Sequence, residues 1–188
     1  TLSSSSAASD VYKRQPLRSA VIGRILRGVL QLAPVSSAGM NLEKQSRLYR
    51  EVIEAPLSEE ELAFVNSTAF DFAQTLGLQL TYCAQDRLEG ELAVDQRHLQ
   101  PTGIANGGLY CVIGETLASI GAVAACAKPA VGMSNYTDLL GSVREGETIR
   151  AVARPVHVGK RTHLWRVEMR SGDKLVAVTN LKLMVLDS

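Results

Sequence analysis

The sequence contains little cysteine and no cysteine pairing motif. Cys83, Cys111 and Cys126 are the three cysteines of the 188-residue chain, and no two of them are spaced as Cys-x-x-Cys. An odd number of cysteines in apolar surroundings is typical of free thiols that pack as small hydrophobic side chains. This excludes a disulfide scaffold and predicts a reducing compartment, which we take to be the cytoplasm.

The sequence also lacks the motifs of several large enzyme classes. It has no Gly-x-Ser-x-Gly elbow, no P-loop and no Gly-x-Gly-x-x-Gly run, so serine hydrolases, nucleotide triphosphatases and dinucleotide enzymes are unsupported. His98, His157 and His163 do not have the spacing of metal ligands. We therefore expect neither a metal nor another cofactor.

The charge of the chain is nearly balanced. Twenty basic and 19 acidic residues give a formal net charge of +1, which gives no reason to expect nucleic acid or an anionic membrane as the main partner. A composition of 46% apolar and 21% charged residues is typical of one soluble domain with a core.

Three segments of different composition follow one another along the chain. Residues 1–15 are serine-rich and aperiodic, which predicts a non-native or disordered tail outside the fold. Residues 16–57 predict a helical extension, with a basic amphipathic helix over 17–33 and a second helix over 42–53. The basic helix is expected to pack on the domain, and a membrane-surface or transit-peptide role stays open. Residues 58–188 form the predicted main domain.

The periodicity of the main domain predicts an α+β fold. Ser58 and Glu61 match a capping box that starts a helix continuing to Gly77, and a long helix is predicted over 108–127. Pro155 predicts an edge position or a bulge in its strand. Two strands are predicted before the long helix and four after it, over residues 78–83, 88–94, 131–140, 148–158, 163–170 and 174–185.

The long helix carries one charged residue in a long uncharged stretch. Between Leu99 and Ala127 that residue is Glu115. An ionised carboxylate is costly to bury on an apolar helix unless a partner pairs with it or a reaction uses it. One face of the same helix is lined by small residues that allow close approach to a sheet, namely Gly114, Ala118, Gly121, Ala122 and Ala125. The pattern indicates a core helix with a functional glutamate, and it argues against a membrane span.

The start of this helix offers hydrogen-bond donors for an oxyanion. Gly107 and Gly108 would present unpaired backbone amides at the positive end of the helix, and Asn106 is a favoured N-cap residue. Glu115 and Ser119 follow on roughly the same face. A carbonyl held at the amides could be approached by this carboxylate, contributed by a second subunit if the reach within one chain is insufficient. These groups suggest acyl transfer or hydrolysis.

Residues 98–108, with the sequence His-Leu-Gln-Pro-Thr-Gly-Ile-Ala-Asn-Gly-Gly, resemble the hotdog-fold acyl-CoA thioesterases. The likeness is to the branch of phenylacetate-degradation and 1,4-dihydroxy-2-naphthoyl-CoA thioesterases. The family spacing is kept, with six residues from Gln100 to Asn106, nine from Asn106 to Glu115 and four from Glu115 to Ser119. The similarity covers about residues 60–186 and includes Val131-Gly132-Met133, Arg144-Glu145-Gly146 and residues 154–161.

The resemblance implies an antiparallel sheet wrapped around a long central helix, in a homodimer or a dimer of dimers with active sites at subunit interfaces. It implies hydrolysis of an acyl- or aroyl-CoA thioester to a free acid and CoA. Glu115 would be the general base or nucleophile, and the Gly107 amide would polarise the carbonyl. Gln100 would position the carbonyl or water, and Ser119 would support the carboxylate or water. Residues expected to bind substrate are Gly108, Asp138, Gly159, Lys160 and Arg161.

Two positions depart from the family pattern. Asn106 replaces the family histidine, so its side chain can donate a hydrogen bond but cannot titrate. Leu139 stands where close menaquinone-pathway relatives have a histidine, and Asp138 is a candidate replacement for that polar group. Two alternatives stay open. One is a non-catalytic acyl-CoA binding or sensing domain, and the other is an acyl-thioester hydratase, for which a histidine would be expected at position 106.

Overall fold

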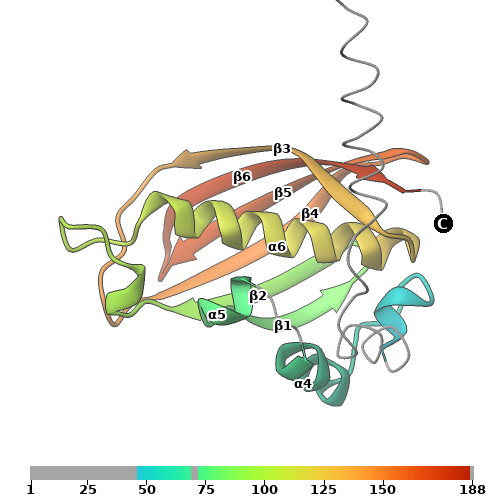
Figure 1. Cartoon of the computed structure of the whole chain (residues 1–188), viewed down its shortest axis with the longest axis horizontal. Helices are drawn as coiled ribbons and strands as arrows, with labels where there is room; N and C mark the ends of the chain where they lie inside the picture. Colours follow the sequence, from blue (N-terminus) through green and yellow to red (C-terminus); the bar gives the residue numbers. More distant parts are fainter. Residues whose placement is uncertain (1–45, 69–71, 187–188) are drawn as a thin grey trace, which may run out of the picture. The chain divides into compact units, whose positions relative to one another are not determined.

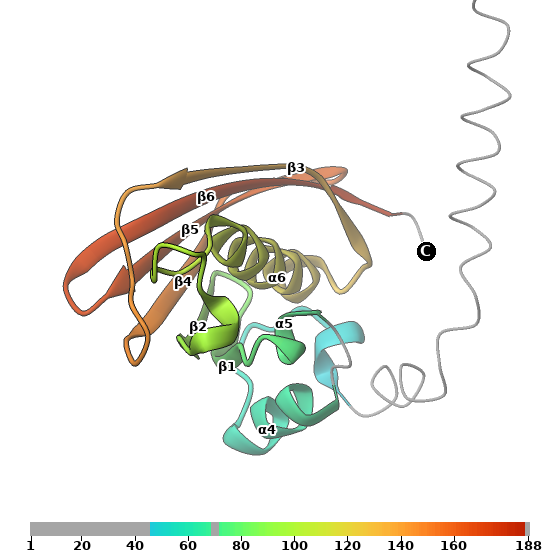
Figure 2. The same cartoon turned by 60° about the vertical axis from the view of Figure 1, so that its left-hand side comes forward.

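A six-stranded antiparallel sheet curves around one long helix, as Figures 1 and 2 show. The fold is described by a computed structural model over residues 46–68 and 72–186. The helix is α6 (Gly107–Cys126), and the strand order is β1-β2-β4-β5-β6-β3. The strands are β1 (Gln79–Ala84), β2 (Arg87–Ala93), β3 (Ala130–Leu139), β4 (Thr148–Val158), β5 (Thr162–Ser171) and β6 (Lys174–Val185). The predicted hotdog fold is confirmed, with two strands before α6 and four after it.

The predicted strands differ from the observed ones by at most one residue at each end. The sequence predicts either an edge position or a bulge at Pro155. It is a bulge, because β4 lies inside the sheet and its register with β5 shifts between Pro155 and His157. A proline is tolerated at such a point, since the ladder of hydrogen bonds is already interrupted there.

The small face of α6 packs directly on the sheet, as predicted. A Cβ atom on Gly114 would lie 2.6 Å from the Cβ atom of Thr179, and one on Gly121 would lie 2.7 Å from the Trp165 ring. Ala118 and Ala122 are fully buried on the same face. Larger side chains at these positions would push the helix away from β5 and β6, so the small residues fix its height above the sheet.

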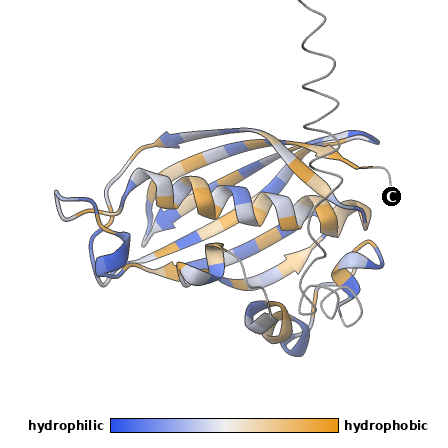
Figure 3. Ribbon diagram, viewed as in Figure 1, coloured by the Kyte–Doolittle hydropathy of each residue, from blue (hydrophilic) through white to orange (hydrophobic). Residues whose placement is uncertain are grey.

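Within the described residues, α6 is also the one helix long and apolar enough to cross a membrane. Half of its most apolar window is buried inside the fold, and Figure 3 shows the apolar helix lying across the sheet. It is therefore the core helix of this fold.

The segment over residues 46–57 packs on the core without forming the predicted helix. The prediction over 42–53 is wrong for its described part, which contains only the 3₁₀-helix η1 (Arg47–Tyr49). Ile53 is fully buried; its N–H donates to Ala124 O (2.9 Å) and its carbonyl accepts from Gln85 N–H (2.8 Å). These bonds hold the backbone to other elements in place of helical bonds. The predictions for residues 1–15 and 17–33 lie outside the described residues.

The helix predicted from Ser58 starts as expected but ends early. In α4 (Glu59–Thr68), Ser58 N–H donates to the Glu61 carboxylate (2.8 Å) and Glu61 N–H donates to the Ser58 hydroxyl (3.3 Å), so the capping box is confirmed. The continuation to Gly77 is wrong, since α5 (Phe72–Thr75) is a separate turn. Gln74 donates to Asn66 O at 2.9 Å, whereas one helix would separate these residues by about 12 Å.

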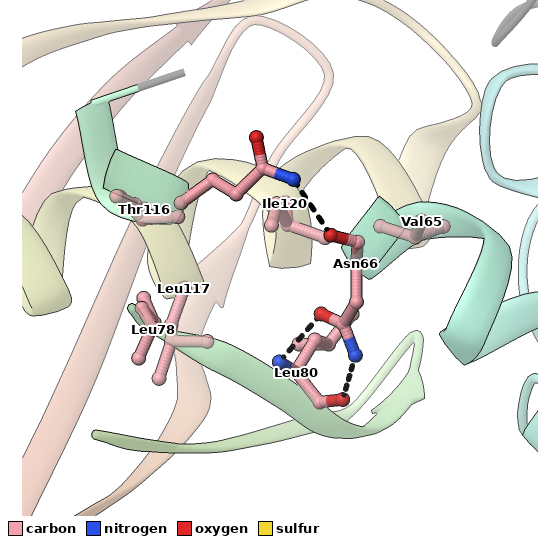
Figure 4. Close-up of a pocket in the computed structure, with 9 residues that line it drawn as sticks. Val65, Asn66, Leu78, Leu80, Thr116, Leu117 and Ile120 are labelled. Carbon is pink, nitrogen blue, oxygen red and sulfur yellow. Dashed lines mark hydrogen bonds between the residues drawn. The ribbon is translucent and has the colours of Figure 1, made fainter. Parts of the chain in front are cut away.

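Asn66 also closes the outer edge of β1. Its side-chain amide donates to Leu80 O and accepts from Leu80 N–H, both at 2.8 Å, as Figure 4 shows. These two bonds imitate the pairing that a neighbouring strand would make. Leu57 N–H donates to Cys83 O further along the same strand (3.0 Å). At the other side of the sheet, β3 pairs only with β6 among the described strands, which leaves its outer edge open.

Candidate active site

The N-terminus of α6 presents one free amide among the described residues. The Asn106 side chain accepts from Gly108 N–H (2.8 Å), which confirms the predicted N-cap and occupies the Gly108 amide. Gly107 N–H donates to no described residue. The Leu139 side chain lies against Gly107, where an added Cβ atom would be 2.7 Å from Leu139 Cδ1. The predicted oxyanion donor at Gly107 is therefore available at the positive end of a 20-residue helix, beside an apolar wall.

Glu115 lies half-buried on α6, with its carboxylate against β3. Asn135 Nδ2 donates to Glu115 Oε2 (3.2 Å) and to Cys111 O (3.0 Å). On the other side, a Cβ atom on Gly132 would lie 2.5 Å from Glu115 Oε1. The carboxylate is thus paired, as the cost of an isolated charge on an apolar helix demands, but its partner is a neutral amide.

Sequence reasoning missed Asn135 as a site residue. An asparagine in the middle of a strand is unusual, and Thr137 follows at the two-residue spacing that places both on one face. That pattern, together with the single glutamate of the preceding helix, is the sequence signal that could have identified Asn135.

An apolar groove, made of adjacent cavities, lies between α5 and α6 beside the candidate site. One cavity of about 260 Å³ is lined by Asn106 and Gly108, and a second of about 380 Å³ is lined by Glu115 and Asn135. The two cavities share Phe72 and Val112, so they lie next to each other along α6. A narrow pocket of about 30 Å³, drawn in Figure 4, extends the second cavity and shares Ala73 and Thr116 with it.

Within one chain, the predicted catalytic groups are too far apart to act on one thioester. Glu115 follows Gly107 by eight residues, which is about 12 Å along the helix axis. A carbonyl oxygen hydrogen-bonded to the Gly107 amide cannot also have its carbon within reach of this carboxylate. The structure places the Gly107 amide and the Glu115 carboxylate along one groove, but too far apart to act on the same carbonyl group.

The turn of Gly159, Lys160 and Arg161 lies at the opposite end of α6 from Gly107. Val185 N–H donates to Arg161 O and Leu186 N–H donates to Pro129 O, both at 2.9 Å, which places the turn beside the C-terminal end of the helix. Lys160 and Arg161 are exposed. One chain therefore does not bring these cations to its own oxyanion donor.

Three other predicted residues have different surroundings. Gln100 is half-buried in the loop before α6, where its N–H donates to Ile104 O (2.9 Å). Ser119 is half-buried one turn after Glu115. Asp138 lies on the sheet face away from α6, because its neighbours on both sides face the helix. No hydrogen bond between described residues joins any of these three side chains to Glu115.

Comparison with known proteins decides the family. Residues 102–178 match the model of the Thioesterase superfamily. A Mycobacterium tuberculosis protein named as an esterase is 34% identical over 123 residues, which cover 62% of this chain and 87% of the relative. The chain belongs to the Thioesterase superfamily.

Other relatives of this thioesterase agree with that assignment. The 1,4-dihydroxy-2-naphthoyl-CoA hydrolase of Escherichia coli is 30% identical over 96 residues, covering 50% of this chain and 70% of that protein. The solved structure of the M. tuberculosis protein superposes with a TM-score of 0.61 at 34% identity, covering 62% of this chain and 97% of that one. A thioesterase from Haemophilus influenzae superposes with a TM-score of 0.64 at 25% identity, covering 73% and 96%.

Two histidines of the thioesterase are buried in the fold. His98 Nδ1 accepts from Asp95 N–H (2.9 Å), so its proton is on Nε2, which donates to Leu76 O (2.9 Å). His163 is buried, and burial lowers its pKa. In the described part of the chain, no group of three His, Cys, Asp or Glu side chains could hold a metal ion.

The three cysteines are free and differ in exposure. Burial raises the pKa of Cys83 to about 12, so this thiol packs as an apolar side chain. Cys126 is half-buried at the end of α6 and donates to Ala122 O (3.0 Å). Cys111 lines the same cavity as Glu115, one helical turn before it.

Proposed function

We propose that this thioester hydrolase acts on acyl- or aroyl-CoA, and that two copies of the chain build each active site. The names of its relatives support a CoA thioester as the substrate class. The reaction needs only water as a second substrate and yields a free acid and CoA. The three free cysteines fit the cytoplasmic location that we also propose.

The separation of Glu115 and Gly107 on one helix carries this proposal. If the Gly107 amide of one copy polarises the carbonyl, the carboxylate that acts on the same carbonyl has to come from the other copy. The open edge of β3 offers the surface for such pairing. Its side chains are unusually exposed for a strand rich in apolar residues: Val131 40%, Met133 54%, Tyr136 66% and Leu139 56%.

Each residue then has a defined role. Glu115 takes a proton from water as the water oxygen bonds to the carbonyl carbon, or attacks that carbon itself to form an anhydride that water then opens. The Gly107 N–H donates to the developing oxyanion, the C–S bond breaks, and the CoA thiolate leaves and takes up the proton released from water. Gln100 positions the carbonyl or water, and Ser119 supports the carboxylate or water. Asn106 caps α6 and holds the glycine amides in place without exchanging protons, since an amide does not titrate. Gly108 lines the groove, and Gly159, Lys160 and Arg161 approach the CoA phosphates.

The test is thioester hydrolysis across a small panel of aliphatic and aromatic acyl-CoA esters. The loss of thioester absorbance is the better readout, because a thiol dye would also react with Cys111. Glu115→Gln is expected to lower kcat by about 10²-fold or more, and the matched exposed variant Glu54→Gln is expected to keep it. Wild-type protein that binds the esters but hydrolyses none would overturn the proposal and indicate an acyl-CoA binding domain.

A further inference from the structure

A row of hydrogen-bonded side chains leads from the core of the fold to Glu115. Thr179 on β6 bonds to Thr137 on β3 (2.7 Å between the hydroxyl oxygens), and the Thr137 hydroxyl donates to Asn135 Oδ1 (2.8 Å). Asn135 Nδ2 then donates to Glu115 Oε2 (3.2 Å). These are bonds between side chains, and none of them is needed to form the helix or the strands. Secondary structure alone therefore does not explain why the side chains line up on one face.

The direction of this row is fixed by its members. Cys111 O can only accept, so the end of the Asn135 amide that contacts it must be the NH₂ group. Asn135 Oδ1 therefore faces Thr137, whose single proton is used in that bond. Thr179 must then donate to Thr137. Every donor in the row points toward Glu115, and the last one meets a carboxylate oxygen.

The far end of the row is immobile. Thr179 is completely buried, and α6 approaches it so closely at Gly114 that a Cβ atom there would lie 2.6 Å from Thr179 Cγ2. A half-exposed glutamate would otherwise sample several rotamers, because its side chain has three rotatable bonds. A donor anchored in the core selects one of them.

We propose that Asn135 is a positioning residue for the hydrolysis, held in place by Thr137 and Thr179. It fixes Glu115 through Oε2 and leaves Oε1 as the oxygen that acts on water or on the thioester. Gly132 provides the space in which Oε1 lies. This inference rests on the proposed catalytic role of Glu115.

The test compares Asn135→Leu, Thr137→Val and Thr137→Ser in the full-length protein, with Thr81→Val on β1 as the control for loss of a hydroxyl. Asn135→Leu is expected to lower kcat by about 10- to 100-fold with KM within about threefold, since the ester still binds in the groove. Thr137→Val is expected to lower kcat by about 3- to 10-fold, and Thr137→Ser is expected to restore it. In the Glu115→Gln background, Asn135→Leu should cause no further loss.

The outcomes separate this inference from the proposed function. Should Glu115→Gln abolish turnover while Asn135→Leu keeps kcat within twofold, the positioning role is wrong and the catalytic glutamate stands. Losses that multiply in the double variant also overturn the positioning role. If Glu115→Gln keeps full activity, the proposed function itself fails. Should Asn135→Leu not fold, equal kcat values for Thr137→Val and Thr137→Ser decide against the inference.

Discussion

At the scale of single residues, the site depends on Gly132, which has no side chain. Gly132 faces the Glu115 carboxylate from β3, and a methyl group there would lie 2.5 Å from Oε1, which is too close unless the carboxylate moves. The atom that would have to move is the end of a flexible side chain in a half-buried place, so the backbone need not adjust. A side chain added at Gly132 would therefore change the position of the carboxylate more than it would change the fold.

We therefore predict that Gly132→Ala lowers kcat by about tenfold or more while the melting temperature changes by no more than a few degrees. The displaced carboxylate should lose its bond to Asn135 and its orientation toward the substrate. Steady-state kinetics and thermal unfolding of the same preparation measure both quantities. Unchanged kcat in a folded Gly132→Ala protein would show that the position of Oε1 does not matter.

Sequence spacing placed Glu115, Asn106 and the glycine amides correctly along one helix, because a helix has one fixed period from which relative positions follow. It could not locate Asn135 or Gly132. Both face Glu115 although they are three residues apart, since the register of β3 with β6 shifts between Gly132 and Ser134. A bulge reverses the alternation of faces along a strand, and no residue type in this stretch predicts a bulge.

At the scale of elements, α4 is tied to the segment before it by one carboxylate. Glu61 accepts from Arg47 (2.6 Å) as well as from Ser58 N–H (2.8 Å). The bond to the Arg47 guanidinium, with the Ser58 backbone amide, lowers the pKa of Glu61 from 4.5 to about 2. Folding therefore favours the ionised form, so this contribution to stability is complete above pH 4.5 and is lost as the pH falls toward 2.

We predict that Glu61→Gln costs about 1 kcal/mol of unfolding free energy at neutral pH, and that the difference from wild type shrinks between pH 4.5 and 2. Glutamine can still accept from Ser58 N–H, so the comparison isolates the ion pair with Arg47. Denaturant unfolding across this pH range provides the measurement, with Glu60→Gln in the same helical turn as the control. A difference that is independent of pH would contradict the assignment.

The strands and α6, which have strong periodicity, were predicted well, whereas the described part of 42–53 and the end of the helix that starts at Ser58 were not. The strands and α6 carry continuous alternating or small-residue patterns, whereas 42–53 and 58–77 have helical spacing that tertiary bonds override. Ile53 bonds to Ala124 and Gln85, and Gln74 folds back onto Asn66. The Ile53 contacts are made with residues distant in the sequence, so a local window does not contain them.

At the scale of the whole molecule, activity and assembly should be lost together. We predict that Met133→Lys, which places a charge on the open β3 strand, shifts the protein from dimer to monomer and lowers kcat/KM in proportion. Val52→Lys, a second exposed apolar side chain far from β3 in the sequence, should change neither. Sedimentation velocity and kinetics at matched concentrations are the measurements. A fully active monomer would show that one chain contains a complete site.

The side chain of Asn66 has a further consequence for how many copies can join. A sheet with two open edges can add molecules at both ends and grow into a filament, whereas a sheet with one open edge is used up after a single pairing. Here the β1 edge is occupied by Asn66 and Leu57 at Leu80 and Cys83, and among the strands that the structure describes β3 alone is left to pair. We therefore expect Asn66, together with Leu57, to limit assembly through sheet edges to two copies.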